Sequence, residues 1–172
     1  ASAIDLGLYA VCETNGSKII HVQSEGFNSF DVRCDHLLVR TTEFGTPKAL
    51  VRGVVSAFAE LGLKVGGFNA VVKSTLPVGA GLSSSAAFSV LIGSALSALF
   101  NDGKVAPVVI ARAGQEAENR YFGKPCGLMS QLVCALGHTL YVDFKTGEMT
   151  PIKADFSSMG LTLCLTDTGG SH

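Results

Sequence analysis

A glycine- and serine-rich run is the part of the sequence whose residue types most directly indicate chemistry. Residues Leu76–Ala87 read LPVGAGLSSSAA and lie between stretches typical of a strand and of an apolar helix. Glycines allow close backbone approach to a ligand, and a helix N-terminus presents unpaired N–H groups at the positive end of its dipole. A strand, a glycine loop and a helix N-terminus together favour phosphate binding. A serine-capped helix after a tight turn is the alternative interpretation.

Three established glycine motifs do not fit this run. It lacks the GK[ST] ending of a Walker A loop and contains no GxSxG nucleophile elbow. The dinucleotide pattern GxGxxG is half matched, because Gly79 and Gly81 are present but Ser84 stands at the third glycine. Asp102 has suitable spacing for a ribose ligand, yet it lies in an Asn-Asp-Gly turn. A dinucleotide-binding module is therefore an alternative supported only by two glycines.

The elements that must position this run form a mixture of strands and helices. Residues 3–12 and Lys18–Val22, separated by a Thr-Asn-Gly-Ser turn signal, predict a hairpin. Further strands are expected at Ser29–Cys34, Gly67–Ser74, Cys134–Phe144 and Leu161–Thr166, and helices at Pro47–Leu61, Leu82–Phe100 and Pro107–Tyr121. This order predicts an α+β fold with a mixed, largely antiparallel sheet and helices packed on one face. A doubly wound parallel sheet is the alternative fold.

Composition limits the class of protein. The 172 residues are 47% hydrophobic and 16% charged, which is enough apolar material for one compact core. A net charge of −1 leaves no basic excess for nucleic acid or an anionic membrane, so neither is an expected partner. Five cysteines without a CxxC pair argue against a disulfide framework or a zinc knuckle and fit a reducing, cytoplasmic location. No oligomeric state is predicted.

One segment has the length of a membrane span. Residues Leu82–Phe100 carry no charge, but they include six serines and follow a Pro/Gly loop, so we expect a buried helix. The first residues lack a basic region and place Asp5 within an apolar stretch, which is not typical of a signal peptide. Because the chain begins without Met and stops at DTGGSH, we expect it to be part of a longer protein.

The glycine-serine run resembles the second motif of the GHMP kinases, and specifically its galactokinase form. Residues Gly114–Gly137, GQEAENRYFGKPCGLMSQLVCALG, are similar to a second galactokinase block. Leu50–Val55 and Ala3–Asp5 resemble earlier blocks in the same order. The resemblance implies that residues 1–172 form a GHMP kinase N-terminal, ATP-binding domain that is incomplete at its N-terminus. The family's C-terminal domain is expected to lie outside this chain.

The resemblance implies a cytoplasmic, ATP- and Mg²⁺-dependent kinase that phosphorylates a hydroxyl of a monosaccharide, with galactose as the default. It implies phosphate contacts from Pro77, Gly79, Ala80, Gly81, Leu82, Ser83, Ser84 and Ser85. It assigns Mg²⁺ to Ser85 and Glu118, and a sugar contact to the backbone of Gly127. Without the motif, Glu118 is more typical of a solvated helix carboxylate. Arg112 and Arg120 could contact phosphate, although exposed arginines are more common.

The sequence departs from the family at the proposed catalytic and substrate-binding position. Galactokinases have a Met-Asp-Gln triplet whose Asp takes or orients the proton of the attacking hydroxyl, but here the triplet is Met129-Ser130-Gln131. A serine hydroxyl is not a useful base near neutral pH. We therefore expect reduced activity, and the alternative function is a catalytically impaired sensor of sugar and ATP.

Overall fold

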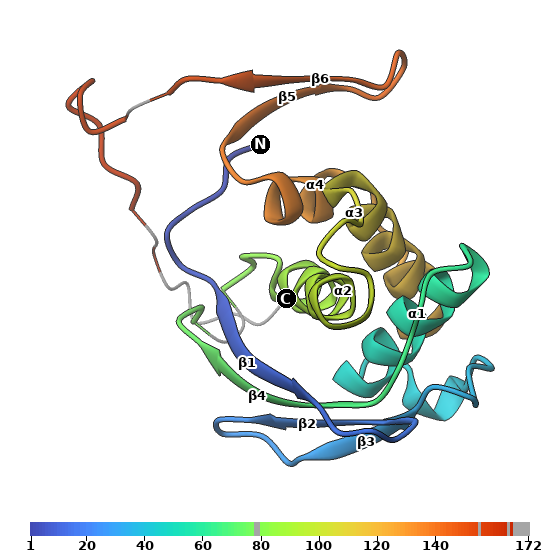
Figure 1. Cartoon of the computed structure of the whole chain (residues 1–172). Helices are drawn as coiled ribbons and strands as arrows, with labels where there is room; N and C mark the ends of the chain where they lie inside the picture. The colour runs from blue at the N-terminus through green and yellow to red at the C-terminus, as the bar shows by residue number, and fades with distance from the viewer. Residues whose placement is uncertain (78–79, 155, 165, 167–172) are drawn as a thin grey trace.

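The computed structural model describes residues 1–77, 80–154, 156–164 and 166. Its strands are β1 (Leu8–Thr14), β2 (Ile19–Ser24), β3 (Phe30–Arg33), β4 (Phe68–Ser74), β5 (Thr139–Asp143) and β6 (Glu148–Ile152). Its helical segments are η1 (Thr41–Glu43), α1 (Pro47–Glu60), α2 (Ser84–Phe100), α3 (Pro107–Glu116), η2 (Ala117–Phe122) and α4 (Met129–Leu136). The helices lie on one side of a four-stranded sheet, and β5 and β6 form a separate hairpin (Figure 1). The predicted α+β architecture is confirmed.

The large sheet has the order β1-β4-β2-β3, with two antiparallel pairs and one parallel pair, β2 with β4. Alternate residues face the helices, as expected for a half-buried sheet. Three of its four strands, β2, β3 and β4, carry fully buried side chains: Ile20, Val22, Val32, Phe68, Ala70 and Val72. These side chains form the core together with the apolar faces of α1, α2 and α3. The sheet therefore supports the central helix α2, whose N-terminus follows the glycine-serine loop.

The predicted hairpin of the first two strands is wrong. Both strands exist, but β4 lies between them, antiparallel to β1 and parallel to β2. The amide of Gly67 donates to the Ser17 carbonyl at 2.9 Å, and the Asn15 amide donates to the Gly67 carbonyl at 3.3 Å. A turn signal predicts that the chain reverses direction, but it does not predict that the two strands are direct neighbours. Here β4 lies between them.

The helix predictions hold for α1, α2 and α3. In α1, the Thr46 side chain accepts a hydrogen bond from the Ala49 amide at 3.3 Å, and Pro47 occupies the first turn. The predicted Leu82–Phe100 helix begins at Ser84, and no helix among the described residues is long and apolar enough to span a bilayer. The helix predicted from Pro107 continues to Phe122, but its last six residues form a π-helical segment.

The strand predictions near the C-terminus are partly wrong. Residues 134–136 belong to α4, and only the later part of the predicted Cys134–Phe144 strand forms β5. A short apolar run fits a helix or a strand equally well, and Leu132 and Val133 are buried on a helix here. No strand forms in the described part of Leu161–Thr166, and β6 was not predicted.

Gly53 on α1 allows α1 to pack closely against η2. A Cβ at this position would lie 2.6 Å from both the Cα and the Cβ of Ala117. We expect Gly53→Ala to destabilise the protein by about 1–3 kcal/mol, because the clash involves backbone that cannot rotate away. Thermal unfolding of the full-length protein measures this effect. Gly7→Ala, where nothing lies within 4 Å of the new Cβ, should change the melting temperature little.

A buried ion pair joins η1 to α1. Arg52 is 2% exposed, and its Nε and Nη2 donate to the two carboxylate oxygens of Glu43 at 2.8 and 2.9 Å. The Arg52 guanidinium also donates to the His36 carbonyl. The hydrogen bond from Arg52 is the main cause that lowers the pKa of the Glu43 carboxyl from its usual value of 4.5.

Glu43→Gln is expected to lower the free energy of unfolding by about 2–3 kcal/mol at pH 7, because it leaves a buried guanidinium without its counter-charge. Since the folded pKa of Glu43 is the lower one, its stabilisation is complete above pH 4.5 and is lost as the pH falls through the folded value. Urea unfolding at several pH values should therefore show a difference between wild type and variant that shrinks below pH 4.5. A difference that grows on acidification would contradict this assignment. Asp35→Asn, in an exposed pair, is the control.

Candidate active site

A cavity of about 310 Å³ lies where the loop after β4 and the N-terminus of α2 meet η2 and the start of α4. Its lining includes most of the site residues predicted from the sequence, namely Pro77, Ala80, Gly81, Leu82, Ser83, Ser84, Ser85, Glu118, Gly127 and Ser130. Gly79 lies outside the described residues. The fold thus brings the two long motifs of the sequence to one cavity.

The glycine-serine loop enters α2 through an unusual backbone conformation. Ser83, which precedes the helix, has φ 56° and ψ 40° and makes no side-chain capping bond. A left-handed conformation is uncommon for a residue other than glycine and is often found at functional sites. It leaves Ser84 and Ser85 in the first helical turn, at the wall of the cavity, where amides have no partner within the helix. This geometry is suited to an anion.

Glu118 is a buried carboxylate, and the interpretation as a solvated helix residue is wrong. It is 3% exposed, it lines the cavity, and its Oε1 atom has no hydrogen-bond partner among the described residues. It lies in the π-helical segment η2, a type of turn frequent at functional sites. An unpaired buried carboxylate oxygen is costly unless a ligand satisfies it. Glu118 is therefore the strongest candidate for a ligand-binding side chain.

The neighbouring charged residues of this helix point elsewhere. Glu116 accepts a hydrogen bond from Arg120 at 2.7 Å, and Arg120 also lies 3.7 Å from Glu60. Arg112 and Arg120 are exposed and do not line the cavity. Glu116 is therefore paired outside the cavity, and neither arginine is among the described residues that line it.

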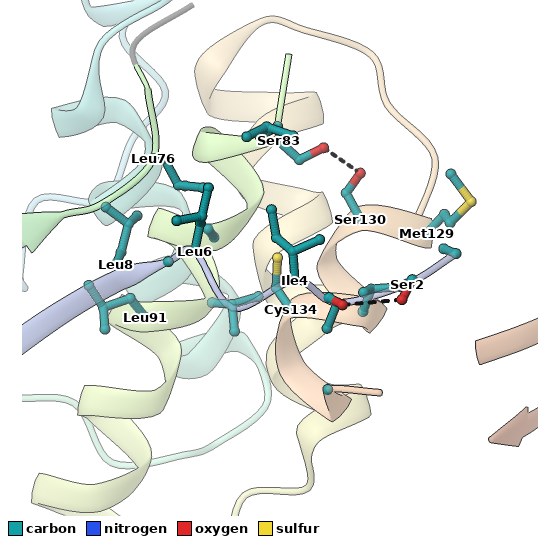
Figure 2. Close-up of a pocket in the computed structure, with 18 of the residues that line it drawn as sticks. Ser2, Ile4, Leu6, Leu8, Leu76, Ser83, Leu91, Met129, Ser130 and Cys134 are labelled. Carbon is teal, nitrogen blue, oxygen red and sulfur yellow. Dashed lines mark hydrogen bonds between the residues drawn. The ribbon is translucent and has the colours of Figure 1, made fainter. Parts of the chain in front are cut away.

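Ser130, in the first turn of α4, is hydrogen-bonded to the glycine-serine loop. Its Oγ atom lies 2.9 Å from Oγ of Ser83, and the two hydroxyls point toward each other (Figure 2). Either hydroxyl can be the donor. The bond joins the proposed phosphate-binding segment directly to the proposed catalytic position, so a change at Ser130 acts on both.

The segment between η2 and α4 is fixed by two side chains of the preceding helical segments. Oδ1 of Asn119 accepts from the Cys126 amide at 2.7 Å, and Nε2 of Gln115 donates to the Cys126 carbonyl at 3.2 Å. Gly127 follows, and a Cβ built there would have no heavy atom within 4 Å. The backbone of Gly127 is therefore held in place and borders open space, as the proposed sugar contact requires.

Cys126 remains a thiol in this surrounding. Burial, and next the adjacent Glu118 carboxylate, raise the pKa of the Cys126 thiol. Nε2 of Gln131 lies 3.4 Å from its sulfur. A protonated thiol is a poor nucleophile. Cys126 is therefore not expected to act as a nucleophile in this cavity.

A wider apolar groove of about 590 Å³ adjoins the cavity. Figure 2 shows it between the N-terminal segment, α2 and α4, lined by Ile4, Leu6, Leu8, Leu76, Leu91 and Cys134. Ser83 and Ser130 line both hollows. The hydrogen-bonded serine pair therefore stands at the boundary between the polar cavity and the apolar groove.

The donors in the cavity fit Mg²⁺ bound together with a nucleotide. Ser85 and Glu118 offer hydroxyl and carboxylate oxygens, which this cation prefers, and Oε1 of Glu118 lacks a partner among the described residues. The described residues contain no group of three His, Cys, Asp or Glu side chains able to hold a metal by themselves. Mg²⁺ sites commonly combine one or two carboxylates with phosphate oxygens, so a single carboxylate is sufficient here.

Two polar residues of this cavity, Lys124 and Gln131, are not predicted as site residues from the sequence. Gln131 is 1% exposed, and its Oε1 atom has no partner among the described residues. Both residues lie within the second long motif, so a search for every charged or amide side chain in that motif would have found them. The burial of Gln131 and the position of Lys124 at the cavity were not predictable from spacing alone.

Comparison with known proteins gives consistent matches. Residues 49–138, more than half of the chain, match the family described as GHMP kinases N terminal domain. The galactokinase of Clostridium tetani is 34% identical over 119 residues, which cover 67% of this chain and 30% of the relative. The galactokinase of Streptomyces coelicolor is 35% identical over 153 residues, which cover 84% of this chain and 39% of the relative. The chain thus spans about a third of the length of these curated relatives.

Solved structures agree with the sequence matches. The galactokinase of Lactococcus lactis complexed with galactose has a TM-score of 0.78 and 26% identity, covering 88% of this chain and 41% of that protein. The mevalonate kinase of Methanococcus jannaschii has a TM-score of 0.70 at 19% identity, covering 90% of this chain and 48% of that protein, and shows the shared fold alone. The resemblance carried by the two glycine-containing motifs is confirmed, and the chain belongs to the GHMP kinase family.

Proposed function

We propose that this chain is the nucleotide-binding, N-terminal part of a sugar kinase that transfers the γ-phosphoryl group of ATP to a hexose hydroxyl. The observation that carries the proposal is the cavity lined together by the glycine-serine loop, by Ser130 and by the buried Glu118, whose Oε1 atom has no partner among the described residues. Phosphoryl transfer depends mainly on positioning and on neutralising phosphate charge. Residues 1–172 would then be completed by the family's second domain and by an N-terminal sugar-binding segment.

In this proposal the chain's own residues position both reactants. The loop amides and the first turn of α2 hold the nucleotide phosphates, with contacts from Pro77 and the residues from Gly79 to Ser85. Glu118 and Ser85 hold Mg²⁺, which when bound neutralises charge on the phosphate oxygens. The backbone of Gly127 and the hydroxyl of Ser130 orient the sugar.

Galactose is the proposed acceptor, because the curated relatives are galactokinases and one structural neighbour is complexed with galactose. The second candidate is a sensor that binds the same two ligands with little turnover. The observation that favours a sensor is Ser130 itself, which is hydrogen-bonded to Ser83 and has no useful basicity. We consider it second because metal and loop contributions to phosphoryl transfer do not require this base.

A coupled ADP-release assay on the full-length protein with ATP, Mg²⁺ and a panel of hexoses tests the kinase against the sensor. Turnover with one hexose supports the kinase. Binding of ATP and a hexose by calorimetry without turnover supports the sensor instead. Absence of ATP binding would contradict both candidates, and a thermal shift with NAD alone would revive the dinucleotide alternative.

A further inference from the structure

Lys124 lines the cavity, but it takes no part in the proposed phosphate and metal contacts. Among the described residues that line the cavity, Lys124 is the only cation and Glu118 the only carboxylate. A triphosphate carries several negative charges, whereas the N-terminus of α2 supplies the equivalent of about half a positive charge. A lysine among the lining residues can therefore supply a further positive charge to a phosphate oxygen.

The backbone of Lys124 is held firmly beside Glu118. Its amide donates to the Glu118 carbonyl at 3.1 Å, and Pro125 follows it. Gly123 precedes it with φ 77°, a conformation that disfavours other residues, and a Cβ there would lie 2.6 Å from the ring of Phe44. The amide hydrogen bond, Gly123 and Pro125 thus fix where the Lys124 side chain leaves the backbone, beside the cavity.

The ammonium group of Lys124 is available to a ligand. None of the ion pairs formed within the described parts of the chain includes Lys124, whereas Arg52 and Arg120 are both paired with carboxylates. The same cavity holds the unpaired Oε1 atoms of the buried residues Glu118 and Gln131. These unsatisfied groups are an independent indication that the cavity receives a polar ligand.

The place of Lys124 in the chain indicates which part of the ligand it contacts. Lys124 comes from the segment that carries Gly127, the proposed sugar contact, and not from the phosphate loop. The group that must lie between the phosphate loop and the sugar is the phosphoryl group to be transferred. A cation on the side of the cavity where the sugar is proposed to bind therefore lies nearer to the terminal phosphate than to the inner phosphates.

We propose that Lys124 contacts the terminal phosphoryl group of ATP, so that the site distinguishes a nucleoside triphosphate from a diphosphate. This inference rests on the proposed function of the cavity. In the transfer step, the bond between the terminal phosphorus and the bridging oxygen breaks, which leaves ADP, and a bond from the sugar oxygen to that phosphorus forms. The proton of the sugar hydroxyl passes to solvent water, because Ser130 is not a base near neutral pH. Charge spreads over the equatorial oxygens as this occurs, and Lys124 stabilises that charge.

Calorimetric titration of the full-length protein with Mg²⁺ and either a non-hydrolysable ATP analogue or ADP tests the proposal. For Lys124→Met we expect affinity for the triphosphate analogue to fall roughly tenfold, since a charge-assisted hydrogen bond is lost. Affinity for ADP should fall less than about threefold, because ADP lacks the contacted group. Lys124→Arg should keep most of the affinity. Lys73→Met, on the exposed face of β4, is the matched control and should change neither.

Two results would overturn the proposal: equal losses for both nucleotides, or no loss for either. In the second case, a rise in the KM of the sugar in steady-state kinetics would place Lys124 against the acceptor. If the wild-type protein binds neither nucleotide, the proposed function itself fails. Thermal unfolding of Lys124→Met should match wild type, because the side chain is exposed and makes no ion pair with a described residue.

Discussion

Glu118→Gln is expected to reduce turnover by roughly 10²-fold or more while leaving the melting temperature equal to or above that of wild type. The activity falls because an amide cannot replace the charged oxygen that is proposed to hold Mg²⁺. The stability is retained because the variant removes a buried carboxylate whose Oε1 atom has no partner in the part of the chain that the structure describes. Turnover, Mg²⁺ dependence of ATP binding and thermal unfolding should be measured on the same preparation.

Glu116→Gln is the matched control for this prediction. Glu116 lies two residues away, and it pairs with Arg120 on the exposed side of the helix. Its replacement should leave both Mg²⁺ dependence and turnover near wild type. A Glu118→Gln protein that keeps its Mg²⁺-dependent ATP affinity, or that loses stability strongly, would indicate a structural carboxylate and not a metal ligand.

Ser130→Asp is expected to increase kcat by ~10²–10⁴-fold, the range that general base catalysis contributes. The carboxylate can take the proton of the attacking hydroxyl, which a serine hydroxyl cannot do near neutral pH. The surroundings accommodate it, because the Ser83 hydroxyl lies 2.9 Å from the Ser130 oxygen and can donate to a carboxylate. Steady-state kinetics with the preferred hexose measures the gain.

Ser130→Asn separates the proton-transfer effect from a positioning effect. The amide has the size of the carboxylate and can accept a hydrogen bond from Ser83, but it is not a base. It should leave kcat close to that of the wild type. An equal gain from Asp and Asn would show that better positioning, and not proton removal, limits the native protein.

The chemistry-bearing segments were predictable because their residue types are specific. The glycine-serine loop combines glycines, which allow close backbone approach, with the start of a helix, and it follows a strand. This combination is specific enough to predict an anion-binding loop. The helices α1 and α3 followed from Pro47 and Pro107 at their starts and from apolar residues at helical spacing. These signals are local, and local signals are visible in a single sequence.

The remaining features depend on contacts between distant segments. The place of β4 between β1 and β2 rests on ladders, and on Gly67 hydrogen bonds, to residues about fifty positions earlier in the chain. The burial of Glu118 depends on the meeting of η2 with the glycine-serine loop and the start of α4, segments that lie far apart in the sequence. The Ser83–Ser130 bond joins two motifs whose distance in space has no signature in their spacing.

The most direct test of the proposed sugar kinase is phosphorus NMR of the full-length protein incubated with Mg²⁺, ATP and galactose. We predict that the γ-phosphate signal of ATP declines while signals of ADP and a sugar phosphate rise together, slowly in the wild type and faster in Ser130→Asp. If no sugar phosphate forms with either protein, although ATP binding by both is established, phosphoryl transfer to galactose is excluded as the function of this cavity.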